Sequence, residues 1–356
     1  MTDEPAENGS KPLLSVENLR SHIHADGDTV HAVDGVSFTI GYGETVCLVG
    51  ESGSGKSVTC ESLTGIVPQP PAEIVGGTVD FDGLSLLDAD DSTLRSVRGN
   101  RISHVFQNPQ QALDPVYTVG EQLVEAMTIH GAANDAATRN RAVDLLRRVG
   151  IPRASKRVDD YPHEFSGGMA QRVAIAIGLA ADPELLIADE PTTAVDVTVQ
   201  ARLIELLRGL TGGGMSLLLV THDLRVVAAL ADRVVVMFGG TVMEQGPVES
   251  VFERPSHPYT QALFESYDGL DRRGERSARD EIPTDGCRFR QECPHAVDAC
   301  EGGTQPTTYP AGDNSTHVVS CVHYASGRDP DPILADARAA SPGGEPEAAN
   351  GGSADE

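Results

Sequence analysis

The sequence has no tryptophan, few aromatic residues, few bases and no long apolar run. Aromatic residues make up 4% of the 356 residues, while hydrophobic and charged residues, at 39% and 22%, match ordinary soluble globular proteins. A sizeable buried core is therefore possible. Because 356 residues exceed the usual size of one compact domain, we expect one large core with an appended part.

The lack of a long apolar run excludes a membrane-spanning helix. No stretch approaches the roughly 20 apolar residues that such a helix needs. The start of the chain, residues 1–7, also lacks the basic and apolar regions of a signal peptide. The sequence therefore predicts a cytosolic protein, and any role at a membrane has to come through a partner that spans the bilayer.

The shortage of bases leaves the chain strongly acidic. Its 53 Asp and Glu oppose 27 Lys and Arg, which gives a formal net charge of -26. Nucleic-acid duplexes reward a basic face, so this balance disfavours general nucleic-acid binding. Salt screens self-repulsion beyond about 8 Å at physiological ionic strength and about 3 Å at 1 M, so the excess predicts a salt-rich, halophilic cytoplasm. A solvated acidic surface without a specific partner is the simpler interpretation.

Short, nearly continuous apolar runs predict strands buried on both faces of a parallel sheet. These runs are residues 45–49, 185–188 and 216–220. Helical patterns separate them, an alternation typical of an α/β nucleotide-binding core. Residues 30–40 and 77–81 predict an antiparallel side sheet. The helical stretch from about 112 to 165 predicts a subdomain inserted between strands.

A glycine-rich run follows the first buried strand and precedes a plausible helix, as a P-loop requires. Glycines let backbone N–H groups turn toward phosphates, and the helix N-terminus favours negative charge. Lys56 is expected to reach the β and γ phosphates of ATP, and Ser57 to bind Mg²⁺. The predicted ATP-binding residues here are Gly50, Glu51, Ser52, Gly53, Ser54, Gly55, Lys56, Ser57 and Val58.

An acidic pair ends the second buried run. We expect Asp189 to organise the Mg²⁺ shell and Glu190 to polarise the water that attacks the γ-phosphate. Such a pair is, taken alone, more often a solvated strand end. The P-loop upstream favours the functional interpretation.

Further motifs, in order along the chain, resemble those of ABC ATPases. Residues 165–172 resemble the signature sequence, a second phosphate cradle at a helix N-terminus. In that family the cradle binds the γ-phosphate held by the opposite subunit of a head-to-tail dimer. The resemblance assigns this role to Ser166, Gly167, Gly168 and Met169.

Three single residues complete the resemblance. Gln107 resembles the Q-loop glutamine, which senses Mg²⁺ and water and couples the site to the membrane partner. Asp196, in residues 193–196, resembles the D-loop aspartate, and His222 the switch histidine that contacts the γ-phosphate. The implied catalytic set is Glu190, His222 and Gln107, and the implied Mg²⁺ ligands are Ser57, Gln107 and Asp189.

The aromatic residue that stacks on adenine in this family has no counterpart. The matching position holds Ile23, between His22 and His24. Histidine stacking on the base and an exposed pair of polar side chains both fit the sequence.

Flanking residues resemble the ATPases of oligopeptide and dipeptide permeases over roughly residues 12–325. They are residues 106–109, 113–116, 188–200 and 257–260. The resemblance implies an ATPase at the cytoplasmic face of the membrane, with two transmembrane permease subunits, a second ATP-binding subunit and an extracellular solute-binding protein, and no nucleic acid. The alternatives are an importer ATPase for nickel or sugar, and a soluble iron-sulfur ABC ATPase acting on nucleic acid or ribosomes.

Four cysteines follow the core, at Cys287, Cys293, Cys300 and Cys321. Clustered thiols in a cytosolic chain favour a metal over disulfides, and the wide spacings do not match the C-x2-C pairs of structural zinc. The peptide-importer family carries four such cysteines, which implies a [4Fe-4S] cluster. Zinc and free or disulfide-bonded thiols are the alternatives.

The expected organisation has four parts. They are a disordered N-terminus (1–11), an ABC ATPase domain (12–270), a cysteine module (281–325) and a disordered acidic tail (326–356).

Overall fold

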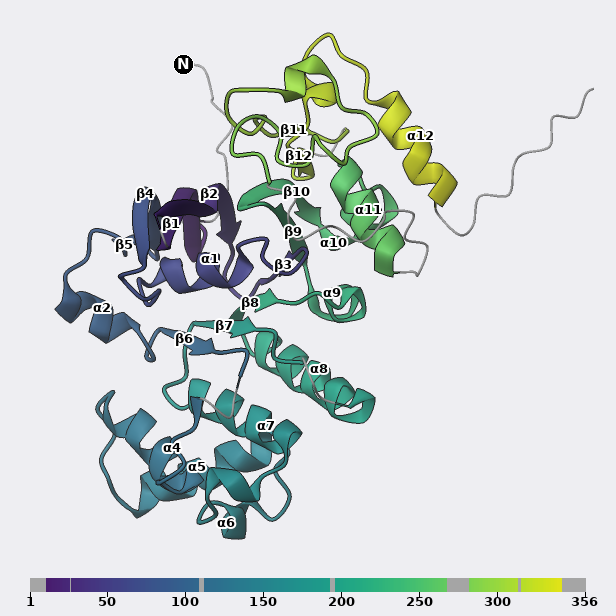
Figure 1. Ribbon diagram of the computed structural model, residues 1–356. Helices are drawn as coiled ribbons and strands as arrows, with labels where there is room; N and C mark the ends of the chain where they lie inside the picture. The colour runs from purple at the N-terminus through teal and green to yellow at the C-terminus, as the bar shows by residue number, and fades with distance from the viewer. Residues whose placement is uncertain are drawn as a thin grey trace, which may run out of the picture.

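The computed structural model describes the chain in six stretches and builds it around two sheets (Figure 1). The described residues are 11–25, 27–108, 112–192, 196–267, 282–312 and 315–340. Within these stretches, no helix is long and apolar enough to cross a membrane.

The larger sheet has eight strands in the order β11-β12-β10-β9-β3-β8-β7-β6. Its five strands from β9 to β6 are parallel, and the others pair antiparallel. Every residue of β3 and β8 is buried, which confirms the predicted central strands. The strands are β3 (Thr45–Val49), β6 (Ile102–Val105), β7 (Leu185–Asp189), β8 (Ser216–Val220), β9 (Arg233–Phe238), β10 (Thr241–Pro247), β11 (Tyr309–Pro310) and β12 (Val318–Val319).

The smaller sheet is antiparallel, in the order β2-β1-β4-β5, and confirms the predicted side sheet. Its strands are β1 (Leu14–Ala25), β2 (Asp28–Ile40), β4 (Ala72–Phe81) and β5 (Leu84–Ser85). The sequence analysis missed β1. Shifts in its pairing with β2 interrupt the apolar alternation that would have marked it.

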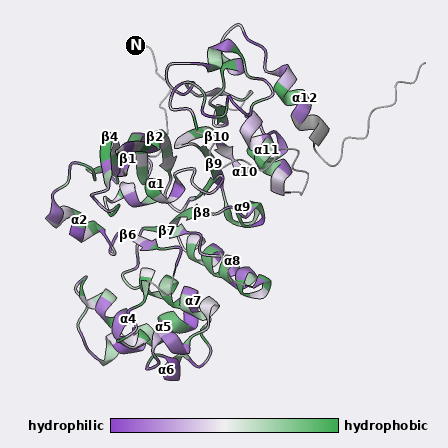
Figure 2. Cartoon of the chain, in the orientation of Figure 1, coloured by the Kyte–Doolittle hydropathy of each residue, from purple (hydrophilic) through white to green (hydrophobic). Residues whose placement is uncertain are grey.

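Helices separate and flank the strands, with hydrophobic and hydrophilic residues alternating along them (Figure 2). Between β6 and β7, helices α4 and α5 both pack against α7, which begins beyond the predicted limit of the helical subdomain at residue 165. The α-helices are α1 (Lys56–Leu63), α2 (Asp91–Val97), α4 (Val119–Thr128), α5 (Ala136–Arg148), α6 (Ala154–Arg157), α7 (Gly167–Gly178), α8 (Val197–Thr211), α9 (Leu224–Leu230), α10 (Val248–Glu253), α11 (Pro258–Tyr267) and α12 (Asp331–Ala340).

The predicted cysteine module, here called the cysteine segment (residues 282–325 with a gap at 313–314), is joined to the larger sheet. Strand β12 pairs with β10, and β11 pairs with β12, so these short strands extend the sheet at its edge. Phe289 is 1% exposed and packs edge-on against Phe238 of β9 and against Tyr259 of α11. Its ring therefore belongs to the same apolar core as the nucleotide-binding part.

The prediction that residues 326–356 are disordered is wrong for their first part. Helix α12 lies beside α11 in Figure 1 and contacts it. Ile333 and Leu334 are buried, and the Ile333 carbonyl accepts a hydrogen bond from Gln261 Nε2 at 3.0 Å. Two apolar side chains suffice to pack the helix, and the polar composition of the whole tail concealed them. Residues 1–10 and 341–356 lie outside the described residues.

Phe289→Ala is expected to destabilise the chain. Loss of this buried ring should lower the free energy of unfolding by about 3–5 kcal/mol. Denaturant unfolding followed by circular dichroism measures it. Ile129→Ala, at a side chain that is 70% exposed, is the control and should stay within about 0.5 kcal/mol of the parent. Equal midpoints for the two variants would contradict the packing role of Phe289.

Candidate nucleotide-binding site

The P-loop joins β3 to α1 by a turn that leaves no room for side chains at two glycines. Gly50 and Gly55 have φ angles of 150° and 97°. A Cβ at Gly50 would collide with the carbonyl oxygen of Met237, and one at Gly55 with that of Ala32. The loop is therefore packed tightly between β9 and β2, and its shape depends on glycine.

Lys56 is buried at the start of α1. Its Nζ donates hydrogen bonds to the carbonyl oxygens of Gly50 and Glu51, at 2.9 and 2.8 Å, and to Ser54 Oγ at 3.1 Å. Burial lowers the pKa of Lys56, although nearby carboxylates oppose this effect. The P-loop thus holds the Lys56 amine beside the backbone N–H groups at the start of α1, which suit a bound phosphate.

Asp189 and Ser57 form a donor set for Mg²⁺. The Ser57 side chain lies close enough to the Asp189 carboxylate to lower its pKa, and Asp189 Oδ1 is buried without a hydrogen-bond partner. Burial raises the pKa of Asp189, the neighbouring Ser57 opposes the rise, and the Glu190 charge adds to it. A buried carboxylate oxygen without a partner is costly, and Mg²⁺ prefers oxygen ligands. These two residues therefore fit a magnesium ion.

The three predicted catalytic residues come together at the carboxyl ends of neighbouring parallel strands. Gln107, after β6, donates from Nε2 to Glu190 Oε2 at 2.8 Å. His222, after β8, places Nδ1 3.3 Å from Glu190 Oε1. Glu190 itself has a left-handed φ of 46° just after β7, a conformation that costs energy for a side-chain-bearing residue. Gln107, expected also as a Mg²⁺ ligand, is here joined to Glu190.

The signature residues do not join this site within one chain. Ser166 is the N-cap residue of α7, is exposed, and makes no side-chain capping hydrogen bond. Helix α7 lies apart from the turn between β3 and α1 (Figure 1). Gly167 is exposed too, whereas Met169 packs against the core. The N-terminus of α7 is thus open to another molecule.

The D-loop prediction is partly covered by the structure. Asp196 caps α8 by accepting a hydrogen bond from the N–H of Val199 at 3.0 Å. Residues 193–195 lie outside the described residues.

The expected adenine position lies on the β1–β2 hairpin. Ile23 pairs with Val30 across the hairpin. His22 stacks on His31, with ring centroids 4.2 Å apart, whereas His24 is exposed and bonds with Thr29. The prediction that both histidines are exposed is therefore confirmed for His24, whereas His22 is half-buried against His31.

A pocket of about 490 Å³ opens between this hairpin and the P-loop. Its lining combines the hairpin, the P-loop and the chain just before the first clustered cysteine, through residues such as Val30, His31, Gly53, Ile282 and Pro283. The pocket could therefore hold the base of a nucleotide whose phosphates bind to the P-loop.

No disulfide joins the four clustered cysteines, all of which lie among the described residues. Cys287, Cys300 and Cys321 are buried, and the Cys287 N–H donates to the Cys300 carbonyl oxygen at 3.0 Å. Burial raises the pKa of Cys293 and of Cys321 to about 12. The alternative of disulfide-bonded thiols is not what the structure shows.

Sequence reasoning missed two contacts that link distant segments to the site. The Tyr259 hydroxyl accepts a hydrogen bond from the N–H of Glu51 in the P-loop at 3.0 Å. Arg288, from the cysteine segment, forms an ion pair with Asp34 of β2. Residues 257–260 carry a family resemblance, but no local pattern predicts these partners.

Comparisons with known proteins agree with this geometry. A family model described as "ABC transporter" matches residues 33–193, and one described as "Oligopeptide/dipeptide transporter, C-terminal region" matches residues 243–300. The oligopeptide transport ATP-binding protein AppD of Bacillus subtilis is 44% identical and aligns over 81% of this chain and 90% of its own. The dipeptide transport ATP-binding protein DppD of Bacillus subtilis is 43% identical over 87% and 94%.

Solved structures share the fold. The bacterial ABC transporter cassette MJ0796, solved as a dimer, matches with a TM-score of 0.60 and 28% identity over 66% of this chain and 98% of its own. The protein cbiO1 from Clostridium perfringens matches with a TM-score of 0.57 and 29% identity over 68% and 91%.

The fold and the site define an ATP-binding subunit of the ABC class. Within that class, the chain belongs to the oligopeptide/dipeptide transporter family of ATP-binding subunits.

Asp189→Asn is expected to weaken Mg²⁺ binding. The Mg²⁺ concentration for half-maximal ATP hydrolysis should rise about tenfold or more, equivalent to at least about 1.4 kcal/mol, because a neutral oxygen replaces a charged one. Steady-state ATPase assays over a Mg²⁺ series measure it. Asp182→Asn, at an exposed residue, makes the same chemical change and should leave the midpoint unchanged. An unchanged midpoint in Asp189→Asn would remove Asp189 from the ligand set.

Proposed function

We propose that this chain hydrolyses ATP to drive the uptake of oligopeptides or dipeptides through membrane permease subunits. One observation carries the mechanism: the Glu190 carboxylate lies between the Gln107 amide and the His222 ring, beside the P-loop lysine and the Asp189–Ser57 pair. The peptide substrate class is supported by the names of the relatives and by the family model over the C-terminal segment.

Glu190 is the general base in this proposal. One carboxylate oxygen accepts from the Gln107 amide, and the other lies beside His222. These contacts fix the carboxylate so that it can orient a water molecule and take its proton. Lys56 and Mg²⁺, when bound by Ser57 and Asp189, supply the positive charge that stabilises the transferred phosphoryl group.

Two subunits complete each site. Ser166, Gly167 and the backbone N–H groups at the N-terminus of α7 are exposed hydrogen-bond donors that suit a phosphate. They lie apart from the P-loop of their own chain, so this phosphate would belong to ATP bound by another subunit. A head-to-tail pair, of two copies or of this chain with a paralogue, places them on the partner's ATP. MJ0796, solved as a dimer and in one structure bound to ADP and Pi, supports a pair of cassettes as the working unit.

Exposed apolar side chains close to Gln107 in the sequence suit contact with a permease subunit. They are Phe106, Val116 and Tyr117. A membrane partner seated on them would contact the segment that carries Gln107 and so couple hydrolysis to transport. The chain then works as a peripheral protein at the cytoplasmic face of the membrane, in a system with a solute-binding protein, and its net charge of -26 supports operation at high salt.

Glu190→Gln is expected to lower the turnover number for ATP roughly 10²- to 10⁴-fold, the usual contribution of a general base. ATP-dependent dimerisation should persist, because the P-loop and the signature residues are intact. Phosphate release and light scattering measure the two effects. Glu205→Gln, on the exposed face of α8, is the control. Wild-type turnover in Glu190→Gln would refute the general-base assignment.

The proposal includes a [4Fe-4S] cluster held by Cys287, Cys293, Cys300 and Cys321. Cys287, Cys300 and Cys321 are buried, Cys293 is half-buried, and the other three thiols all interact electrostatically with Cys321. Four neighbouring thiols in one loop-rich segment suit the thiolate ligands of such a cluster. When bound, the cluster supplies one-electron redox chemistry, and the four cysteines hold it against the core.

Purification without oxygen in high salt should yield about four iron and four sulfide per chain, with the visible absorption of a cluster. Cys293→Ser should lose most of both, because it removes one ligand. Cys60→Ala, at a buried thiol outside the segment, should retain both. Stoichiometric zinc in place of iron would replace the cluster with a zinc site and leave the ATPase assignment intact.

A further inference from the structure

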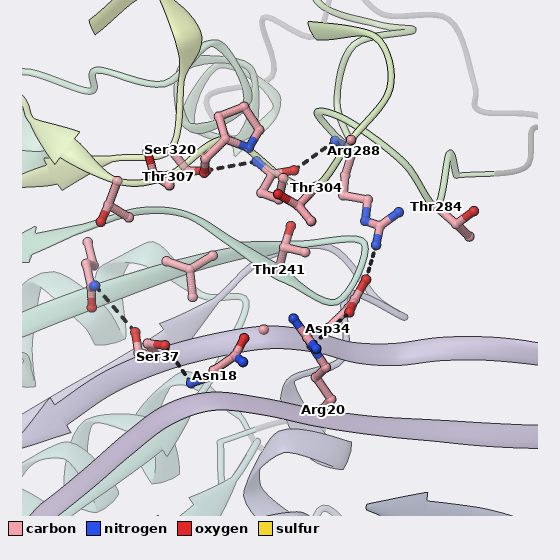
Figure 3. Close-up of a pocket in the computed structure, with 17 residues that line it drawn as sticks. Asn18, Arg20, Asp34, Ser37, Thr241, Thr284, Arg288, Thr304, Thr307 and Ser320 are labelled. Carbon is pink, nitrogen blue, oxygen red and sulfur yellow. Dashed lines mark hydrogen bonds and ion pairs between the residues drawn. The ribbon is translucent and has the colours of Figure 1, made fainter. Parts of the chain in front are cut away.

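A polar pocket of about 390 Å³ separates the β1–β2 hairpin from the cysteine segment (Figure 3). Arg20 of β1 pairs in register with Asp34 of β2. Their side chains point toward Arg288, which reaches Asp34 from the other side of the pocket (Figure 3). The Asp34 carboxylate is therefore held in place by two guanidinium groups from different parts of the chain.

Two histidines lie next to this carboxylate. His22 and His31 stack with an angle of 27° between their rings. His22 Nε2 and His31 Nδ1 are buried, and neither has a hydrogen-bond partner. His31 Nδ1 is 3.7 Å from Asp34 Oδ2, beyond hydrogen-bond distance. Two buried ring nitrogens thus lie unsatisfied beside a carboxylate, which is unusual in a folded protein.

We propose that His22, His31 and Asp34 bind one divalent transition-metal ion, distinct from the Mg²⁺ of the ATP site. One ligand atom from each residue lies within 4.8 Å of the other two. Ligands at about 2.1 Å from one tetrahedral ion lie about 3.4 Å apart, so small side-chain rotations would complete the site. Imidazole nitrogen with a carboxylate suits Zn²⁺, Co²⁺ or Ni²⁺ and selects against Mg²⁺ and Ca²⁺.

The surroundings favour the form of each ligand that a metal needs. Burial, followed by the neighbouring His31, lowers the pKa of His22, which favours the neutral ring that a metal needs. Arg288 and Arg20 hold the Asp34 carboxylate, as outer-shell groups commonly hold a metal ligand. Their positive charges also oppose a cation, which limits affinity but leaves the geometry preorganised.

The position of the site gives the ion a structural consequence. His31 also lines the pocket beside Gly53 of the P-loop, and Asp34 holds Arg288 of the cysteine segment. An ion on these ligands would fix the hairpin, which borders both the nucleotide pocket and the polar pocket next to the cysteine segment.

Titration of the full-length chain with Co²⁺ under anaerobic conditions tests the proposal. Calorimetry counts the bound equivalents, and absorption separates thiolate-bound Co²⁺, which has intense near-ultraviolet bands, from Co²⁺ on nitrogen and oxygen. The wild type should bind one equivalent without thiolate bands. The double variant His22→Ala with His31→Ala should lose that equivalent.

Two further variants control the experiment. His24→Ala removes an exposed histidine of the same strand and should bind Co²⁺ as the wild type does. His31→Gln keeps a polar side chain, guards against misfolding, and should weaken the same equivalent at least tenfold. The proposal fails if the wild type binds Co²⁺ only through thiolates, if the double variant keeps the equivalent at wild-type affinity, or if His24→Ala loses it.

Discussion

The parallel pairing of β3 with β8 on one side and β9 on the other is the constraint on which the site depends. It brings the carboxyl ends of β3 and β8 to one edge of the sheet, and β7 and β6 continue the same direction. The P-loop, Glu190, His222 and Gln107 follow these four strands, and Asp189 is the last residue of β7. The strand order therefore brings a lysine, two carboxylates, an amide and an imidazole together.

The same sheet ties the cysteine segment to ATP binding. Strand β9 leads into β10, which pairs with β12 of that segment. Phe238 ends β9 and packs on both Tyr259 and Phe289, and the Tyr259 hydroxyl bonds with the P-loop. A displacement of the segment would have to disturb aromatic packing that also supports the P-loop. The two parts are mechanically continuous.

Much of the site could be predicted because its residues sit in short local motifs at strand ends. The predicted strands 45–49 and 216–220 coincide with β3 and β8, since burial on both faces makes nearly every residue apolar. The meeting of Gln107, Glu190 and His222 came only from family resemblance, because each follows a different strand.

The long-range contacts could not be predicted. Arg288 and Asp34 are 254 positions apart, and the P-loop and Tyr259 are 208 apart, so their meeting depends on the path of the chain through β9, β10 and α11. The stacking of His22 on His31 depends on irregular pairing between β1 and β2, which no sequence periodicity records. Helix α12 was missed because two apolar residues in a polar segment leave composition almost unchanged.

Arg288 and Phe289 contribute differently to the contact between the cysteine segment and the rest of the chain. A buried ion pair gains little net free energy, because desolvation of both groups offsets their attraction. Burial of a phenylalanine side chain contributes about 1.5–3 kcal/mol by its area alone. Phe289 therefore supplies most of the stabilisation, whereas a displaced Arg288 would leave a buried charge without its partner. The position of Arg288 against Asp34 affects the nucleotide pocket, because Asp34 belongs to the hairpin that borders this pocket.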